Sequence, residues 1–191
     1  FRNASSAVTV ELGSKAVQGN ATMRATLVDI EGVSGSNYND VLVGSAGNDW
    51  IEGRGGNDSI NLTAGGKDTL AYGDMKLSDA GGGNGNDVVT GFSVGSWEAM
   101  GNTDRIDLSE LLQGYAPVSG DATAAKYIDG VATINAGDSI ANYLSVQTTA
   151  TGTDIKVDKH GDGIDYATVL TLSGVQTDLA TLLANHQITL V

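Results

Sequence analysis

The chain reads Gly35-Ser-Asn-Tyr-Asn-Asp-Val-Leu-Val43, then Gly44-Ser-Ala-Gly-Asn-Asp-Trp-Ile-Glu52, then Gly53-Arg-Gly-Gly-Asn-Asp-Ser-Ile-Asn61. These are three consecutive copies of one nine-residue pattern. After one inserted residue a fourth copy occupies residues 63–71, and after an irregular stretch, 72–81, a fifth occupies residues 82–90. The first six positions of each unit are rich in Gly, Asn and Asp, which favour tight turns. The last three place an aliphatic residue between two others, as a short strand does.

Each unit therefore predicts one turn and one short strand. The middle residue of each strand is expected to point inward and its two neighbours outward. These middle residues are Leu42, Ile51, Ile60, Leu70 and Val89. One unit cannot bury its apolar side alone, so several units must stack around a thin aliphatic column. A flexible Gly-rich linker would not keep its Asp and aliphatic positions in phase.

Composition limits the possible partners. The 191 residues suffice for one domain with a real core, and 23 acidic against 10 basic residues give a net charge of −13. No basic stripe is present, so we expect no nucleic acid and no anionic lipid as a partner. The chain has no Cys, hence neither disulfides nor thiolate chemistry. No apolar run approaches the roughly 20 residues of a transmembrane helix, so direct membrane insertion is not expected.

The chain begins Phe1-Arg-Asn-Ala, with no initiator Met and no signal-peptide pattern. We therefore expect it to be a piece of a longer protein. Before the repeats, residues 6–12 alternate apolar and polar positions and predict a strand, and residues 26–33 predict a second.

The segments after Thr90 are also expected to be β-rich. Residues 104–112 predict a strand end followed by a short helix from Ser109. A strand and a short helix are expected within 131–144. Further strands are expected within 144–157 and 167–172, with loop 158–166 closing a hairpin. A cap residue, an acidic first turn and spaced Leu residues predict a helix over 177–183.

The repeats match the pattern G-G-x-G-x-D-x-U-x, where U is a large aliphatic residue, and so resemble the calcium-binding nonapeptides of repeats-in-toxin (RTX) proteins. The resemblance implies an all-β fold: a right-handed parallel β-roll, or β-solenoid, with flanking β-strands and a few short helices. Consecutive units then lie on opposite edges, with each calcium ion between two turns of one edge. We divide the chain into N-terminal strands that cap the roll (1–34), the roll (35–90) and a β-rich C-terminal cap (91–191).

The resemblance also implies a set of calcium ligands. Calcium prefers six or more hard oxygen ligands, and the repeats hold no imidazole or thiolate for a softer metal. Asp40 and Asp58 are expected on one edge, and Asp49, Asp68 and Asp87 on the other. Carbonyl ligands are expected from turn positions Gly35, Asn37, Gly44, Ala46, Gly53, Gly55, Gly65, Gly82 and Asn84.

Some positions depart from the pattern. Tyr38 stands where the fourth-position Gly belongs, and the fourth unit begins Thr-Ala in place of Gly-Gly, with Lys67 beside its Asp. The stretch 72–81 lacks the motif, so one edge is expected to be interrupted there, with Asp74 or Asp79 as a possible substitute ligand.

Acidic residues beyond the repeats are further candidates. Asp104 and Asp107 can either ligate calcium at the end of the roll or form a solvated strand end paired with Arg105. Asp158-Lys-His-Gly-Asp162-Gly-Ile-Asp165 resembles the first half of an EF-hand loop, with oxygens at positions 1 and 5 and Gly at 6, but lacks the downstream Glu. It is either another calcium loop or a hairpin turn.

No catalytic constellation is expected. Gly91-Phe-Ser-Val-Gly95 fits G-x-S-x-G, but that motif needs a strand–turn–helix within a large α/β sheet, which the surrounding pattern does not predict. The Gly-rich run near residue 82 is not a phosphate loop, because no G-K-[ST] follows. We therefore expect the chain not to be an enzyme.

The remaining expectations concern export. Residues 85–94 and 103–112 resemble the C-terminal module of large type I–secreted RTX adhesins of Gram-negative bacteria, and residues 170–191 fit that family's end. The resemblance implies a secreted or cell-surface location, a role in cell adhesion and biofilm, and a secretion signal in about the last 15 residues. Its partners would be the type I secretion machinery, an ABC transporter and an outer-membrane channel, and we expect a monomer.

Two other functions remain open from the sequence. The chain could be the C-terminal β-roll of a secreted protease or lipase, whose catalytic domain would precede Phe1. It could also be a ligand-binding solenoid, such as an ice binder, although its turn positions lack a regular array of Thr.

Overall fold

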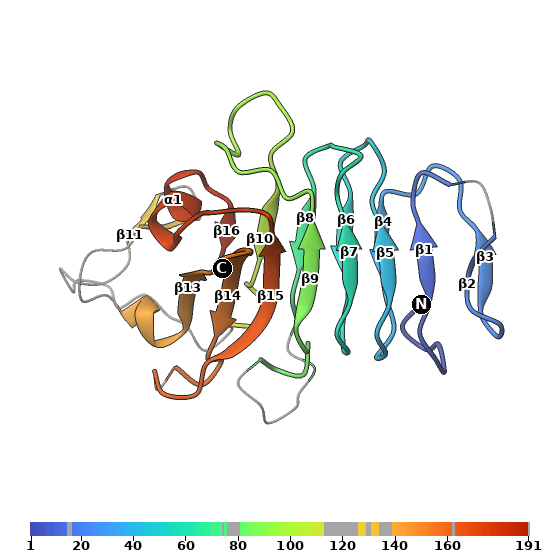
Figure 1. Ribbon diagram of the computed structural model, residues 1–191, viewed down its shortest axis with the longest axis horizontal. Coiled ribbons are helices and arrows are strands. Elements are labelled where there is room, and N and C mark those ends of the chain that lie inside the picture. Colours follow the sequence, from blue (N-terminus) through green and yellow to red (C-terminus); the bar gives the residue numbers. More distant parts are fainter. Residues whose placement is uncertain are drawn as a thin grey trace.

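A computed structural model describes residues 1–14, 17–73, 75, 81–112, 126–128, 131–133, 139–161 and 163–190. The fold is mostly β, with two main sheets and little helix. The nine-stranded sheet A has the order β13-β14-β15-β9-β7-β5-β1-β2-β3, and the five-stranded sheet B has the order β16-β10-β8-β6-β4. Figure 1 shows the repeat strands of the two sheets stacked one behind the other.

The strands of sheet A are β1 (Thr9–Glu11), β2 (Val17–Gly19), β3 (Arg24–Thr26), β5 (Val41–Val43), β7 (Ser59–Asn61), β9 (Asp87–Thr90), β13 (Leu144–Thr148), β14 (Gly152–Val157) and β15 (Ala167–Ser173). Those of sheet B are β4 (Gly32–Ser34), β6 (Trp50–Glu52), β8 (Thr69–Ala71), β10 (Arg105–Asp107) and β16 (Ile188–Thr189). A separate pair joins β11 (Lys126–Ile128) to β12 (Val131–Thr133), and the helices are η1 (Ser139–Asn142) and α1 (Leu179–Ala184).

Successive repeats contribute strands to opposite sheets. From β4 to β10 the chain alternates between sheet B and sheet A, and neighbouring strands within each sheet are parallel. In sheet A, Leu42 lies opposite Ile60, and Ile60 lies opposite Val89. This is the β-roll that the repeat pattern predicted.

The core is the aliphatic column between the sheets. Its five predicted members are at most 1% exposed: Leu42, Ile51, Ile60, Leu70 and Val89. Most flanking positions face outward as expected, with Val41 at 43% and Val88 at 46% exposure. Glu52 and Thr69 are at outward positions too, but are only 8% and 9% exposed.

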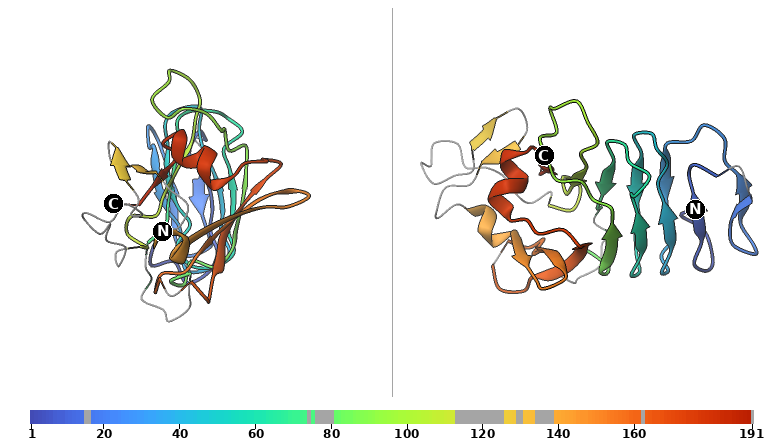
Figure 2. Two further views of the ribbon diagram at one scale, coloured as in Figure 1. Left: turned by 90° about the vertical axis from the view of Figure 1, so that its left-hand side faces the viewer. Right: turned by 45° about the horizontal axis from the view of Figure 1, so that its top comes forward.

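Both sheets continue past the repeats. Strand β1 pairs with β5, so the N-terminal strand of the predicted segment 6–12 extends sheet A. Strand β15 pairs in parallel with β9, and β16 pairs in parallel with β10. The views in Figure 2 likewise show the C-terminal part at one end of the roll. The sequence boundaries near 34 and 90 thus fall within continuous sheets.

Several predicted elements are confirmed in the C-terminal part. Strand β12 and helix η1 lie within 131–144, and loop 158–166 closes the antiparallel pair β14–β15. The segment 144–157 is itself a hairpin of β13 and β14, turning through 149–151. Helix α1 lies in the expected place, but its N-cap is Asp178, whose side chain accepts from the Thr181 N–H.

Two other predictions were wrong. Only the end of 26–33 is a strand, because β3 stops at Thr26 and β4 starts at Gly32. The expected helix from Ser109 is a single turn, in which the Leu111 and Leu112 N–H groups donate to the Leu108 carbonyl. Within the described ranges, no helix has the length and apolar character to cross a membrane.

Candidate calcium sites

The repeat turns form two edges of the roll. We call the turns that lead from sheet B to sheet A the first edge, and those that lead from sheet A to sheet B the second edge. Each turn ends at the residue that immediately precedes or begins a strand. In every repeat this residue is the Asp at the sixth position of the unit, so the carboxylates stack at the two edges.

The first edge carries Asp40, Asp58 and Asp87. The Asp40 N–H donates to Asp58 Oδ1 at 2.7 Å, and the Asp58 N–H donates to Asp87 Oδ1 at 2.9 Å. The Val8 N–H donates to Asp40 Oδ1 at 2.8 Å, so the ladder continues to the residue that precedes β1. Each carboxylate therefore uses one oxygen to join its turn to the preceding one.

The second edge carries Asp49, Asp68 and Asp104. The Asp49 N–H donates to Asp68 Oδ1 at 2.9 Å, and the Asp68 N–H donates to Asp104 Oδ1 at 3.0 Å. Asp104 Oδ2 also accepts from the Ser93 N–H at 2.8 Å. The structure thus gives Asp104 the same place in its ladder that the repeat aspartates hold.

The predicted edge for Asp87 was wrong. Asp87 belongs with Asp40 and Asp58, because β8 lies in sheet B and the next strand, β9, lies in sheet A. The 19-residue interval from Asp68 to Asp87 therefore contains one passage of the chain from sheet B to sheet A, as each nine-residue interval contains one passage between the sheets. The suggested substitutes Asp74 and Asp79 lie outside the described residues.

One buried carboxylate oxygen on each edge has no hydrogen-bond partner. These atoms are Asp58 Oδ2 and Asp68 Oδ2, and their residues are 2% and 0% exposed. Both belong to the middle aspartate of a ladder, between two other carboxylates. None of the ion pairs found among the described residues involves a ladder aspartate. A buried unpaired anion is costly, so these oxygens are suited to bind a cation.

Backbone carbonyl oxygens lie close to the carboxylates of the ladder. A Cβ on Gly35 would lie 2.6 Å from the Gly53 carbonyl oxygen and would collide with Asp40 Oδ2. A Cβ on Gly53 would collide with Asp58 Oδ2 and lie 3.2 Å from Asp87 Oδ2. The first position of the repeat must therefore be Gly here, because the carboxylates of two turns converge on it.

The electrostatics agree with this geometry. Burial, reinforced by neighbouring aspartates, raises the pKa of Asp58 and of Asp68 to about 7 and that of Asp87 to about 8. Burial also raises the pKa of Asp104. The stacked carboxylates thus resist ionisation without a cation, and a divalent ion between turns would remove that resistance.

The predicted carbonyl ligands lie on these turns. The first edge holds Gly35, Asn37, Gly53, Gly55, Gly82 and Asn84, and the second edge holds Gly44, Ala46 and Gly65. For Asn84 the structure adds the side-chain oxygen as a candidate calcium ligand. The residue is 1% exposed, and its Oδ1 has no hydrogen-bond partner among the described residues. Its Nδ2 donates to the Gly73 and Gly81 carbonyls, which fixes the amide in place. Calcium ligation by Asn84 and by the carbonyls of the other turn residues stays a prediction.

The structure explains why Tyr38 is tolerated in place of Gly. In the third, fourth and fifth units the fourth position has a positive φ, at Gly56, Gly66 and Gly85. The first unit instead uses Ser36, whose Oγ accepts from the Tyr38 N–H at 3.1 Å and donates to Asp40 Oδ1 at 2.7 Å. A serine turn of this kind needs no positive φ, so a side chain fits at position 38.

Three further sets of residues, whose hydrogen bonds support the two edges, were not identified from the sequence. The Tyr72 hydroxyl donates to Asp87 Oδ2 at 3.0 Å, and Tyr72 is 3% exposed. The buried Gln187 donates through Nε2 to the carbonyls of Ser93 and Asp104.

A stack of Asn side chains also joins the turns. The Asn57 N–H donates to Asn39 Oδ1, the Asn86 N–H to Asn57 Oδ1 and the Lys67 N–H to Asn48 Oδ1. The Asn that precedes four of the five repeat Asp residues was the available signal for this stack.

The other acidic candidates are placed differently. Asp107 ends β10, at the opposite end of the strand from Asp104, and its Oδ1 accepts from the Ser109 N–H and hydroxyl. Asp158 is fully buried, and its oxygens accept from the N–H groups of His160, Gly161 and Gly163 in its own loop. That pattern is typical of a hairpin turn. Asp162 lies outside the described residues, so calcium binding by this loop stays a prediction.

The residues of the two edges fit calcium. They offer anionic and neutral oxygens only, and the unpartnered Asp58 and Asp68 oxygens lie between turns lined by glycine. Within the described ranges, no three Asp, Glu, His or Cys side chains converge as a metal cluster. An ion at either edge would accordingly take two carboxylates from neighbouring turns and complete its shell with backbone or amide oxygens.

A known family of repeats matches part of the chain. Residues 34–70 match the family model of the RTX calcium-binding nonapeptide repeat (4 copies). Among solved structures, the AlgE6R3 subunit from the Azotobacter vinelandii mannuronan C5-epimerase is similar over 85% of this chain and 84% of that chain, with 24% identity and a TM-score of 0.37. No curated protein matches the chain. Residues 34–70 are therefore a block of RTX calcium-binding nonapeptide repeats, whose turns bind several calcium ions.

Proposed function

We propose that the chain is a calcium-dependent folding and type I secretion module of an extracellular RTX adhesin, with no catalytic role of its own. The observation that carries the calcium-dependent folding is the pair of buried, unpartnered carboxylate oxygens, Asp58 Oδ2 and Asp68 Oδ2. Without calcium these groups oppose folding. With calcium they hold adjacent turns together.

The free-energy balance supports a folding switch. A ligand that binds only the folded state stabilises it by RT ln(1 + [L]/Kd). With a Kd of roughly 0.1–1 mM, as in extracellular calcium modules, each site contributes on the order of 1–2 kcal/mol at a few millimolar calcium. At submicromolar cytosolic calcium that contribution vanishes. The chain would then stay unfolded inside the cell, suited to export through a channel, and fold outside.

Circular dichroism tests the folding step. In millimolar calcium we expect the β-sheet spectrum of a folded protein, and in chelator the spectrum of a disordered chain. Magnesium at the same concentration is the control, because its small octahedral shell suits these turns poorly. A fully folded protein in chelator would contradict the proposal.

Export and parentage need separate tests. The chain fused behind a reporter, in cells with a type I transporter, should carry the reporter into the medium, and removal of the last 15 residues should retain it. The full reading frame decides the parent: long tandem repeats before Phe1 support an adhesin, whereas a catalytic domain there would indicate a protease or lipase.

A further inference from the structure

The outer face of sheet B carries two rows of side chains that the calcium sites do not use. One row runs across the strands through Ser34, Glu52, Ala71 and Asp107, which the strand register places side by side. The neighbouring row holds Gly32, Trp50, Thr69 and Arg105. Trp50 is therefore flanked in its row by a glycine and a threonine.

Trp50 is an exposed aromatic platform. It is 40% exposed, although β6 is paired with a strand on both sides, because its row neighbours are Gly32 and the buried Thr69. Neither neighbour covers the indole ring. Exposed Trp rings at the edge of a hollow are typical anchors for ligands, since they offer a large apolar surface at little conformational cost.

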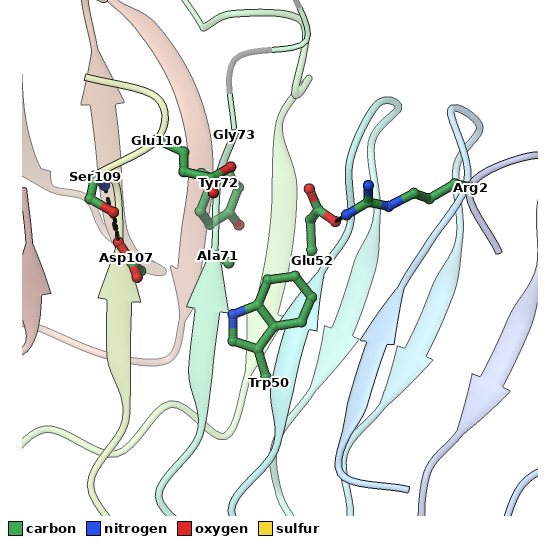
Figure 3. Close-up of a pocket in the computed structure, with 9 residues that line it drawn as sticks. All are labelled: Arg2, Trp50, Glu52, Ala71, Tyr72, Gly73, Asp107, Ser109 and Glu110. Carbon is green, nitrogen blue, oxygen red and sulfur yellow. Dashed lines mark hydrogen bonds and ion pairs between the residues drawn. The ribbon is translucent and has the colours of Figure 1, made fainter. Parts of the chain in front are cut away.

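A hollow of about 130 Å³ opens beside Trp50, and three carboxylates surround it. In Figure 3, Asp107 and Ser109 lie on one side, Glu52 and Arg2 on the other, with Tyr72 and Glu110 between them. The volume is well below the roughly 300 Å³ of a buried cofactor pocket, so only one small ring or side chain can enter.

Glu52 is held in position at the wall of this hollow. It is 8% exposed, its Oε2 accepts from the Ser34 hydroxyl at 2.5 Å, and Arg2 lies 3.5 Å away. Its Oε1 has no partner among the described residues and points toward Gly73, as does Glu110 Oε2. An oriented carboxylate whose second oxygen is open to the hollow can accept a hydrogen bond from a donor that enters it.

The spacing of the acceptors decides the chemistry of that donor. Glu52 and Asp107 are two strands apart with Ala71 between them, so their backbones are about 9–10 Å apart. Among the described residues no three acidic side chains converge on one point as a metal site requires, and the carboxylates of this hollow lie around its wall. A sugar ring instead presents hydroxyls around its rim and an apolar face for stacking on an indole. The net charge of −13 disfavours acidic sugars and phosphates.

We propose that this hollow binds a neutral sugar residue of a glycan chain. The ring lies over Ala71, its apolar face contacts Trp50, and its hydroxyls donate to Glu52, Asp107 and Glu110. A second hollow, on the other side of Trp50, is lined by Lys67 and Trp97 and extends the surface to further residues of the glycan. Surface binding of this kind would give the module a role beyond folding and export.

Calorimetric titration tests the proposal on the whole chain in millimolar calcium, after circular dichroism has confirmed folding. The probes are neutral tetrasaccharides of glucose, mannose and galactose, with a galacturonate tetramer and a lysine-rich peptide for comparison. At least one neutral tetrasaccharide should bind saturably. Trp50→Ala should weaken that binding at least about tenfold, and Glu110→Gln severalfold, while Trp50→Phe retains part of it.

Val88→Ala is the matched control, because Val88 is 46% exposed on the outer face of sheet A and should leave binding unchanged. Failure to bind any neutral tetrasaccharide would overturn the proposal, as would binding that survives Trp50→Ala. Preferential, Trp50-dependent binding of the peptide would also overturn it and identify a protein-docking surface. Since folding is checked first, none of these results depends on the proposed calcium switch.

Discussion

At the scale of single residues, the middle aspartate of each ladder controls calcium binding. Asp58 and Asp68 each use Oδ1 for the N–H of the preceding turn and leave Oδ2 without a partner. Asn keeps the first contact and the side-chain size but cannot offer a second anionic oxygen. Asp58→Asn and Asp68→Asn should therefore each remove one bound calcium ion and raise the calcium concentration at the folding midpoint at least about tenfold.

Calorimetry for stoichiometry and circular dichroism for the midpoint check this prediction. Asp29→Asn is the control, since Asp29 is exposed, has a positive φ that Asn tolerates, and gives the same change of charge. Equal effects of all three substitutions would mean that net charge, and not the ladders, sets calcium affinity.

Tyr72 supports the last carboxylate of the first edge. Its hydroxyl donates to Asp87 Oδ2, and burial together with that carboxylate raises the pKa of Tyr72, so the phenol stays a neutral donor. Loss of a hydrogen bond that orients a metal ligand typically costs 10–100-fold in affinity. Tyr72→Phe should raise the calcium midpoint by about tenfold. Tyr38→Phe, at a 47% exposed position, should not shift it.

The raised pKa values predict opposite pH dependence with and without calcium. For Asp58, Asp68 and Asp87 the pKa in the fold, about 7 to 8, exceeds the ordinary value of 3.8. Between these values the folded chain binds more protons than the unfolded chain, so stability without calcium is highest below pH 4 and falls as the pH rises to about 8. With calcium, protons compete for the same carboxylates, so affinity should rise with pH over this range.

Circular dichroism in buffer stripped of calcium on a chelating resin should accordingly show more folded chain at pH 5 than at pH 8. The calcium midpoint should be lower at pH 8 than at pH 6. A calcium-free chain that is better folded at pH 8 would contradict the assignment of these carboxylates to buried, stacked positions.

At the scale of elements, the repeat period predicted the strands and their inward residues because each unit carries its own turn and strand signals. The period did not predict the edge of Asp87, since residue counts cannot distinguish a missing strand from a long loop. It also left Tyr38 unexplained, because the Ser36 turn that accommodates it depends on hydrogen bonds to Asp40. The contribution of Gln187 depends on a contact with Asp104, 83 residues earlier in the chain, for which the sequence holds no local signal.

The buried aliphatic column stabilises the same folded state that calcium stabilises. A loss of burial in the column should therefore raise the calcium concentration needed for folding. Leu70 is fully buried in β8 between Ile51 and Ile106. Leu70→Ala should cost about 2–5 kcal/mol through lost burial and a cavity. The effect should appear as a higher calcium midpoint in a titration followed by circular dichroism. Val41→Ala, which trims a 43% exposed side chain of β5, should change the midpoint little, and an equal shift would place the stabilisation outside the column.

At the scale of the whole molecule, the C-terminal part is joined to the roll through both sheets. Strand β15 continues sheet A beyond β9, and β16 continues sheet B beyond β10. Gln187, just before β16, is fully buried and binds the carbonyl of Asp104 at 2.7 Å, so the calcium edge and the chain end share one hydrogen-bond network. Calcium bound to the ladders should therefore order strands that contain no repeat.

Hydrogen exchange followed by mass spectrometry measures this coupling. Amides of β15 and β16 should gain protection at the same calcium concentration as those of β7 and β8, because β15 and β16 each pair in parallel with a strand of the roll, β9 or β10, and lose that partner when the roll is unfolded. Gln187→Ala removes its contacts to Ser93, Gly95 and Asp104. It should separate the two midpoints, with protection of β16 then requiring more calcium than protection of β7. Protection of β15 and β16 that persists in chelator would show instead that the C-terminal part folds independently of calcium.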